Sequence, residues 1–68
     1  MPLNSSRPQL VPDQVFISKE AAGILGVSHK TFLKYRDMGL ITPINPGSTR
    51  PKYFGRDIMQ CYDAALLL

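Results

Sequence analysis

The chain has 68 residues, a formal net charge of +3, one cysteine and one histidine. This length suits one small domain whose core is near the lower limit for independent stability, with little room for a walled cofactor pocket. The single Cys61 excludes an internal disulfide, and one cysteine with one histidine cannot complete a four-ligand zinc site, so we expect no cofactor and no metal.

Residues 1–14 read MPLNSSRPQLVPDQ, with three prolines and neither a helical nor a strand period. This pattern predicts a flexible or extended N-terminal arm, with Leu10 and Val11 touching the core of a domain over residues 15–68. The start lacks the basic and apolar segments of a signal peptide, and no apolar run reaches membrane-spanning length. We therefore expect a cytoplasmic protein with no membrane partner.

The first predicted helix runs from about Lys19 to Leu25. Ser18 suits its N-cap because a serine hydroxyl can accept from a free backbone N–H of the first turn. Glu20 lies near the positive end of the helix dipole. The residues at helical spacing that we expect to be buried are Ala21, Ala22 and Leu25.

The second predicted helix follows a break at Gly26, is capped by Ser28 and ends near Met38. Phe32 and Tyr35 fall one turn apart and are expected to face inward. The residues expected to face outward are His29, Lys30, Leu33, Lys34 and Asp37. Two short helices joined by a tight turn form a helix-turn-helix pattern, in which the second helix would enter a DNA groove.

After Gly39, residues 40–41 are expected to form a short strand that pairs with a second strand over residues 52–54. This hairpin would be a wing with Arg50 and Lys52 near its tip. A last helix over about 56–67 shows the clearest helical period. Its expected buried residues are Ile58, Cys61, Tyr62, Ala65 and Leu66, and Tyr53 and Phe54 are expected to face inward as well. The predicted fold class is mainly α with a small β-hairpin, a winged helix-turn-helix.

Positive charge is concentrated in the middle of the chain. Residues 28–56 hold six cations and one acid, a local net of +5, whereas the rest of the chain holds two cations and four acids, a net of −2. The six cations are Lys30, Lys34, Arg36, Arg50, Lys52 and Arg56. Such segregation favours a polyanionic partner over an ordinary surface of mixed charge.

The runs ISKEAAGILGVSHKTFLKYRDMGLITP and RPKYFGRDI resemble the winged helix-turn-helix of phage excisionases and MerR-type regulators. The resemblance covers residues 15–63. Two departures matter: the chain stops at Leu68, without the long helix and effector domain of MerR-type proteins, and Leu33 stands where those proteins often have a basic residue. The resemblance therefore favours the small excisionase type, acting in a bacterial host cell.

The candidate DNA contacts on the second helix are Ser28, His29, Lys30, Thr31, Leu33, Lys34 and Arg36, and those on the wing are Ser48, Thr49, Arg50 and Lys52. Lys30 and Lys34 lie one turn apart and could read base edges or clamp phosphates. Leu33 either meets a thymine methyl or is an exposed leucine without a role.

The remaining cations leave alternatives open. Arg36 either reaches the DNA backbone or pairs with a nearby acid, and Arg56 either contacts DNA or flanks the last helix. Arg50 and Lys52 either contact phosphates or enter a narrow minor groove.

The function that the resemblance implies is that of an excisionase. Such a protein binds repeated sites in attachment DNA beside neighbouring copies of itself, bends the DNA and directs an integrase toward excision. A small MerR-like transcriptional regulator that reads an inverted repeat is the nearest alternative, and a protein-docking module is a second. No nucleophile, base and orienting residue assemble in the sequence, so we expect no enzyme activity.

Overall fold

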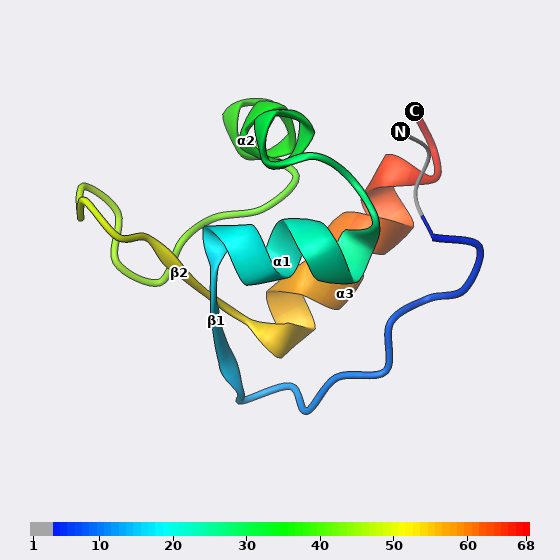
Figure 1. The fold of residues 1–68 in the computed structure, drawn as a ribbon, viewed down its shortest axis with the longest axis horizontal. Helices are drawn as coiled ribbons and strands as arrows, with labels where there is room; N and C mark the ends of the chain where they lie inside the picture. Colours follow the sequence, from blue (N-terminus) through cyan, green and yellow to red (C-terminus); the bar gives the residue numbers. More distant parts are fainter. Residues whose placement is uncertain (1–3) are drawn as a thin grey trace.

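The computed structural model describes residues 4–68, which form three helices and a two-stranded antiparallel sheet (Figure 1). In chain order the elements are β1 (Val15–Ile17), α1 (Ser18–Leu25), α2 (His29–Asp37), β2 (Lys52–Phe54) and α3 (Gly55–Ala65). Figure 1 shows α1 lying across the view and α2 nearly end-on, so the two helix axes cross steeply. The mixed, helix-rich class expected from the sequence is confirmed.

The sheet pairs β1 with β2, in the register Val15 opposite Phe54 and Ile17 opposite Lys52. The prediction that residues 40–41 would be the partner strand is therefore wrong. Val15–Ile17, expected only to lead into the first helix, takes that place. Along the chain, α1, α2 and the long loop that follows them lie between the two paired strands.

The loop before β2 follows the strand without forming a ladder with it. Ile44 N–H donates to the Lys52 carbonyl at 2.8 Å, while the Lys52 N–H donates to Asn45 Oδ1 at 2.9 Å. Pro43 has no N–H to donate, and the Lys52 N–H already donates to the Asn45 side chain. Two of the backbone donors that a ladder would need at this point are therefore missing. Ile41 instead packs as a buried loop residue.

The start of α1 differs from the sequence prediction. Ser18 is the first residue of the helix and Ile17 is its N-cap, so the Ser18 hydroxyl does not cap it. Ile17 has no side-chain acceptor; its own N–H donates to Glu20 Oε1 at 3.1 Å. The shift follows from β1, because pairing extends the backbone through Ile17 and the helix starts directly after the strand.

The turn from α1 to α2 forms as predicted. Gly26 has a φ of +80°, a left-handed conformation in which a Cβ would be strained. Gly26 N–H and Val27 N–H both donate to the Ala22 carbonyl at 3.0 Å and close α1. Ser28 then caps α2, accepting from the Thr31 N–H at 3.1 Å.

The core lies where α1, α2, β2 and α3 meet. Its fully buried larger side chains are Leu25, Phe32, Tyr53, Ile58 and Cys61. The predicted stripe of α3 is buried except for Leu66, which is 58% exposed because α3 ends at Ala65. Tyr35 and Phe54 are half-buried. Leu33, expected to face outward, is also half-buried and packs against the core.

Residues 4–14 contain no helix or strand, and hydrogen bonds hold both ends of this segment to the helices. The Asn4 N–H donates to the Leu25 carbonyl at 3.0 Å, and Tyr62 Oη donates to the Asn4 carbonyl at 2.7 Å. At the other end the Gly55 N–H donates to the Gln14 carbonyl at 2.8 Å. Of the two alternatives predicted for this segment, a flexible or an extended arm, the structure shows the extended one: a strap along α1 and α3.

Of the two arm residues expected to touch the core, only one does. Leu10 packs against it, whereas Val11 is 62% exposed. Residues 1–3 of the predicted arm lie outside the described part of the chain. Within residues 4–68, no helix is both long and apolar enough to cross a membrane.

Candidate functional site

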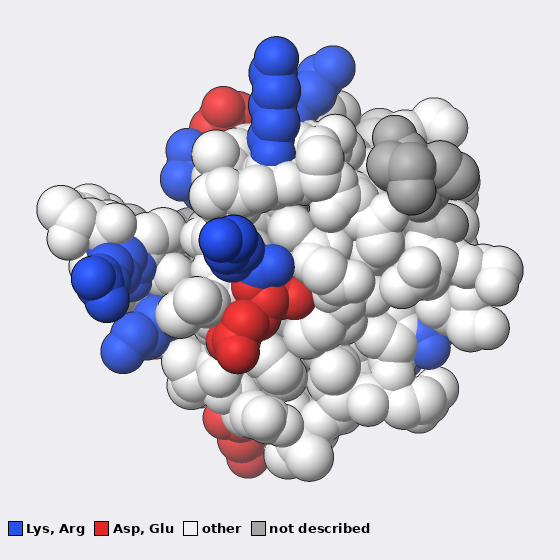
Figure 2. Space-filling view, viewed as in Figure 1, with Lys and Arg blue, Asp and Glu red and all other residues white. Residues whose placement is uncertain are grey.

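The outer face of α2 carries the first group of predicted contact residues. Phe32 anchors the helix in the core, which leaves Lys30 and Lys34 exposed one turn apart. Figure 2 shows lysine and arginine side chains gathered over α2 and over the 44–51 loop. A hollow on this face is lined by Lys30, Thr31, Leu33, Lys34 and Asp37.

The hydroxyls of Ser28 and Thr31 are used within the protein. Ser28 Oγ accepts from the Thr31 N–H and donates to Thr31 Oγ1 at 3.0 Å. These predicted site residues therefore build the start of α2, and their hydroxyls are partly occupied there. They hold Lys30 and Lys34 in place on the first turns of the helix.

The 44–51 loop carries the second group, and its own polar groups shape it. The Asn45 side chain accepts from Lys52 N–H, while Ser48 Oγ accepts from the Arg50 N–H at 3.2 Å. Gly47 has a φ of +86° at the tip. Thr49, Arg50 and Lys52 stay exposed.

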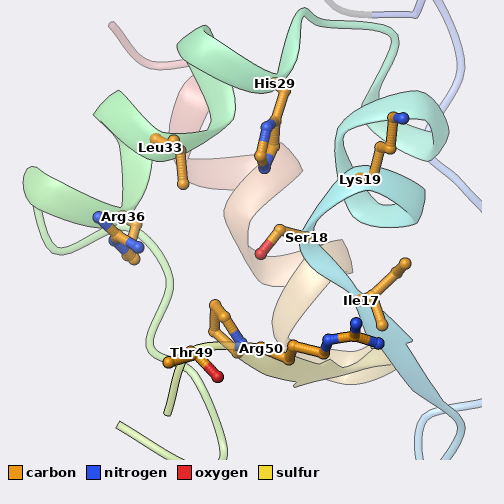
Figure 3. Close-up of a pocket in the computed structure, with 9 residues that line it drawn as sticks. Ile17, Ser18, Lys19, His29, Leu33, Arg36, Thr49 and Arg50 are labelled. Atoms are coloured by element: carbon orange, nitrogen blue, oxygen red, sulfur yellow. The ribbon is translucent and has the colours of Figure 1, made fainter. Parts of the chain in front are cut away.

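A basic groove lies between these two surfaces and the start of α1 (Figure 3). It has a volume of about 430 Å³, and its lining residues are Ile17, Ser18, Lys19, His29, Leu33, Arg36, Thr49, Arg50 and Pro51. Five of the predicted site residues meet here: three from α2 and two from the loop. Figure 3 shows His29 and Leu33 pointing from α2 toward the start of α1.

The remaining predicted residues do not line the basic groove. Lys30, Thr31 and Lys34 lie on the neighbouring hollow of α2. Ser28, Ser48 and Lys52 line neither depression. The sequence-predicted set thus divides into the α2 face, the basic groove and the edge of the loop.

Ion pairs distinguish the cations of this surface from those elsewhere. Among residues 4–68, ion pairs engage only three arginines. Arg7 pairs with Asp63 and Arg56 with Asp13, both at 2.9 Å, and Arg36 forms a longer contact of 3.3 Å with Asp37. In the same part of the chain, the cations without such a pair are Lys19, Lys30, Lys34, Arg50 and Lys52.

Each of the two arginines whose roles the sequence left open contacts an acid in the structure. Arg36 pairs with a nearby acid, Asp37. Arg56 also stacks over the Phe54 ring, with its guanidinium carbon 4.2 Å from the ring centroid. Together with its pair to Asp13, this places Arg56 as a flank of α3.

Sequence reasoning missed four residues of the groove: Pro51 in the loop, and Ile17, Ser18 and Lys19 at the start of α1. The sequence predicted Ser18 as a helix cap, because a serine before a helical period is typical of an N-cap. Only the pairing of Ile17 with Lys52 in the sheet brings the start of α1 beside the loop. No local sequence pattern predicts this contact between residues far apart along the chain.

The thiol of Cys61 lies apart from this surface. The residue is fully buried, and loss of hydration raises the pKa of the thiol to about 11. The prediction of a small buried hydrophobe is confirmed. Within residues 4–68, no group of three or more His, Cys, Asp or Glu side chains could hold a metal ion.

Comparisons with protein-family models, with curated proteins and with solved structures find no match for this chain. Its function therefore has to be argued from the basic groove, the α2 face and the loop themselves.

Proposed function

We propose that this protein binds double-stranded DNA in a sequence-specific manner, as a winged helix-turn-helix. In this proposal α1, the turn at Gly26 and α2 form the helix-turn-helix, with α2 as the recognition helix. The 44–51 loop and the start of β2 are the wing. The single observation that carries the proposal is the division of four of the five unpaired cations between α2 and the wing, on either side of one groove.

In this proposal the two groups of cations meet two adjacent grooves of a DNA duplex. A short helix fits the major groove, where Lys30 and Lys34 would meet base edges or the phosphates that flank them. Arg50 and Lys52 would then contact the adjacent minor groove or its phosphates. Leu33, which is half-buried, still borders the α2 hollow and could reach a thymine methyl.

We propose further that the protein acts as an excisionase. This part rests on the resemblance of residues 15–63 to that family. The size of the domain supports it, because so small a surface gives limited affinity per copy and favours binding by several copies side by side. Bending a short site costs of the order of 1–6 kcal/mol, which contacts between neighbouring copies and with an integrase can offset.

The experiment is selection of bound duplexes from a random DNA pool, followed by quantitative binding to the selected site. The variant Lys34→Ala, Arg50→Ala removes two unpaired cations from the proposed interface. The matched control, Arg7→Ala, Arg56→Ala, removes the same charge from outside it. It breaks two exposed ion pairs of small energetic value and the contact of Arg56 with the Phe54 ring.

Direct repeats about one helical turn apart, bound cooperatively and lost only in the first variant, are the expected result. A single inverted repeat would indicate a transcriptional regulator in place of an excisionase. Absence of enrichment, or equal losses in the two variants, would refute specific DNA binding through this surface.

A further inference from the structure

Ser18 lines the basic groove, and its hydroxyl has no hydrogen-bond partner within residues 4–68. The residue is 8% exposed, and Ser18 Oγ is one of two buried side-chain polar atoms without a hydrogen bond in residues 4–68. Figure 3 shows this oxygen turned toward the space between Leu33 and the 44–51 loop. A buried hydroxyl without a partner is unfavourable in the free protein, which raises the question of what it binds.

The backbone around Ser18 also has donors to offer. Because α1 begins at Ser18, the N–H groups of Ser18 and Lys19 have no helical carbonyl to donate to, and within residues 4–68 they donate to no loop or turn carbonyl. The positive end of the helix dipole lies at the same place. Lys19 and Arg50 line the same groove without ion pairs. The Ser18 hydroxyl, these N–H groups and the two cations can all donate to an anion.

The position of the groove indicates which anion would come to it. If α2 occupies the major groove of a duplex and the wing the adjacent minor groove, a single sugar–phosphate strand separates the two. The basic groove lies between α2 and the wing, so that strand would have to pass along it. Its volume of about 430 Å³ is of the size that holds a small organic ligand, and Ile17, Leu33 and Pro51 offer apolar contacts to a sugar.

We propose that the start of α1 is a site for one backbone phosphate of the DNA strand that crosses the basic groove. The phosphate accepts from Ser18 Oγ and from the free N–H groups of the first turn, with Lys19 and Arg50 beside it. This inference rests on the proposed function and adds a contact that α2 and the wing do not supply. Ser18 Oγ is covered in the free protein, so the lining of the groove has to shift to admit the phosphate.

The proposal predicts opposite effects of one substitution on folding and on binding. Ser18→Ala removes an unsatisfied hydroxyl from the free protein and should keep or raise the melting temperature. In the complex it removes a charge-assisted hydrogen bond, and affinity for the selected duplex should fall about tenfold. Ser6→Ala, a substitution of an exposed serine in the strap, is the matched control and should change neither quantity.

The contact can be assigned to one phosphate by chemical replacement. Each backbone phosphate of the selected duplex is replaced in turn by an uncharged methylphosphonate, and binding of the wild type and of Ser18→Ala is measured. We expect one position at which the replacement weakens the wild type several-fold and weakens Ser18→Ala much less. Equal losses at every position, or an unchanged affinity of Ser18→Ala, would overturn the phosphate site and leave DNA binding through α2 and the wing intact.

A titration with inorganic phosphate, followed by backbone NMR of Ser18 and Lys19, separates this site from the proposed function. Saturable shifts at these two residues, reduced in Ser18→Ala, in a protein that binds no duplex would overturn the backbone-phosphate assignment together with DNA binding. They would identify a site for a free anion. Duplex binding with a Ser18-dependent methylphosphonate effect is the result that supports the inference.

Discussion

Phe32 of α2 and Tyr53 of β2 meet edge to face, with ring centroids 5.1 Å apart and ring planes at 89°. Both side chains are fully buried. The contact ties the helix with the exposed lysines to the strand that follows the 44–51 loop, so it fixes the two sides of the basic groove relative to each other. Packing in the core thereby sets the spacing of the proposed DNA contacts.

Phe32→Ala should cost about 3–5 kcal/mol of unfolding free energy, because it leaves a large cavity and removes the aromatic pair. A domain of this size has little more stability than that to lose, so the variant should be largely unfolded. Phe32→Leu, which keeps most of the apolar volume, should remain folded. Urea denaturation followed by circular dichroism checks this. A folded Phe32→Ala with normal cooperativity would show that α2 is anchored elsewhere.

Tyr53→Phe should stabilise the domain. The Tyr53 hydroxyl is buried and has no hydrogen-bond partner in residues 4–68, so removing it relieves an unsatisfied group while keeping the ring contact with Phe32. The expected gain is about 1 kcal/mol of unfolding free energy, measured as a higher urea midpoint at unchanged slope. A loss of similar size would instead mean that a water molecule satisfies this hydroxyl in solution.

Two glycines in helices should respond to alanine in opposite directions. At Gly23, inside α1, a Cβ would have open space around it, with no atom beyond the adjoining helix backbone within 4 Å, so Gly23→Ala should add about 0.5–1 kcal/mol of stability. At Gly55 a Cβ would run into the Val11 carbonyl and lie 3.2 Å from the Leu10 Cβ. Gly55→Ala should therefore displace the strap and cost about 1–3 kcal/mol.

Thermal unfolding of both variants measures the difference, with amide hydrogen exchange at positions 4, 55 and 56 as the second readout. Exchange there should accelerate in Gly55→Ala alone, because the N–H groups of Asn4, Gly55 and Arg56 donate the hydrogen bonds that dock the strap. Equal protection in the two variants would mean that the strap is not held through Gly55.

Local patterns are sufficient to predict the helices from sequence. The turn at Gly26 and the Ser28 cap depend on backbone conformation and on a hydroxyl within three residues, and both predictions are confirmed. The stripe of α3 is visible as a helical period, and only the prediction for Leu66, beyond the last turn, is wrong. Such features are visible in sequence because the interacting groups are close along the chain.

Long-range pairing cannot be predicted in the same way. Val15–Ile17 has only three residues, too few to show a strand period, and its partner lies beyond two helices. The error in the wing strand and the missed position of Ser18 share this cause. Five of the nine groove residues are nevertheless among the predicted contacts, because charge on a helix or loop surface can be recognised without knowing how the strands pair.

The buried thiol of Cys61 should make stability fall at high pH. Its pKa is raised to about 11 in the folded protein, above the ordinary value of 9.0, so the unfolded chain loses this proton first. The thiol's contribution is fully present below pH 9 and is lost as the pH rises toward 11. Cys61→Ala should lose less stability than the wild type between about pH 8 and pH 10.5, in urea midpoints compared pairwise. Parallel losses would show that the Cys61 thiol does not cause the effect.

The salt dependence of DNA affinity should report how many phosphates the proposed interface neutralises. Five or six contacts per copy predict a slope of log affinity against log salt of about −4.5 to −5.4 on the selected duplex. Lys34→Ala should reduce that slope by about one and weaken binding to all sequences nearly equally if Lys34 meets a phosphate. A slope unchanged by Lys34→Ala, with discrimination between sites relaxed, would mean that Lys34 reads a base edge. Either result would leave Lys30, Lys52 and the groove cations Lys19 and Arg50 to supply the remaining slope, because none of them is held by an ion pair within residues 4–68.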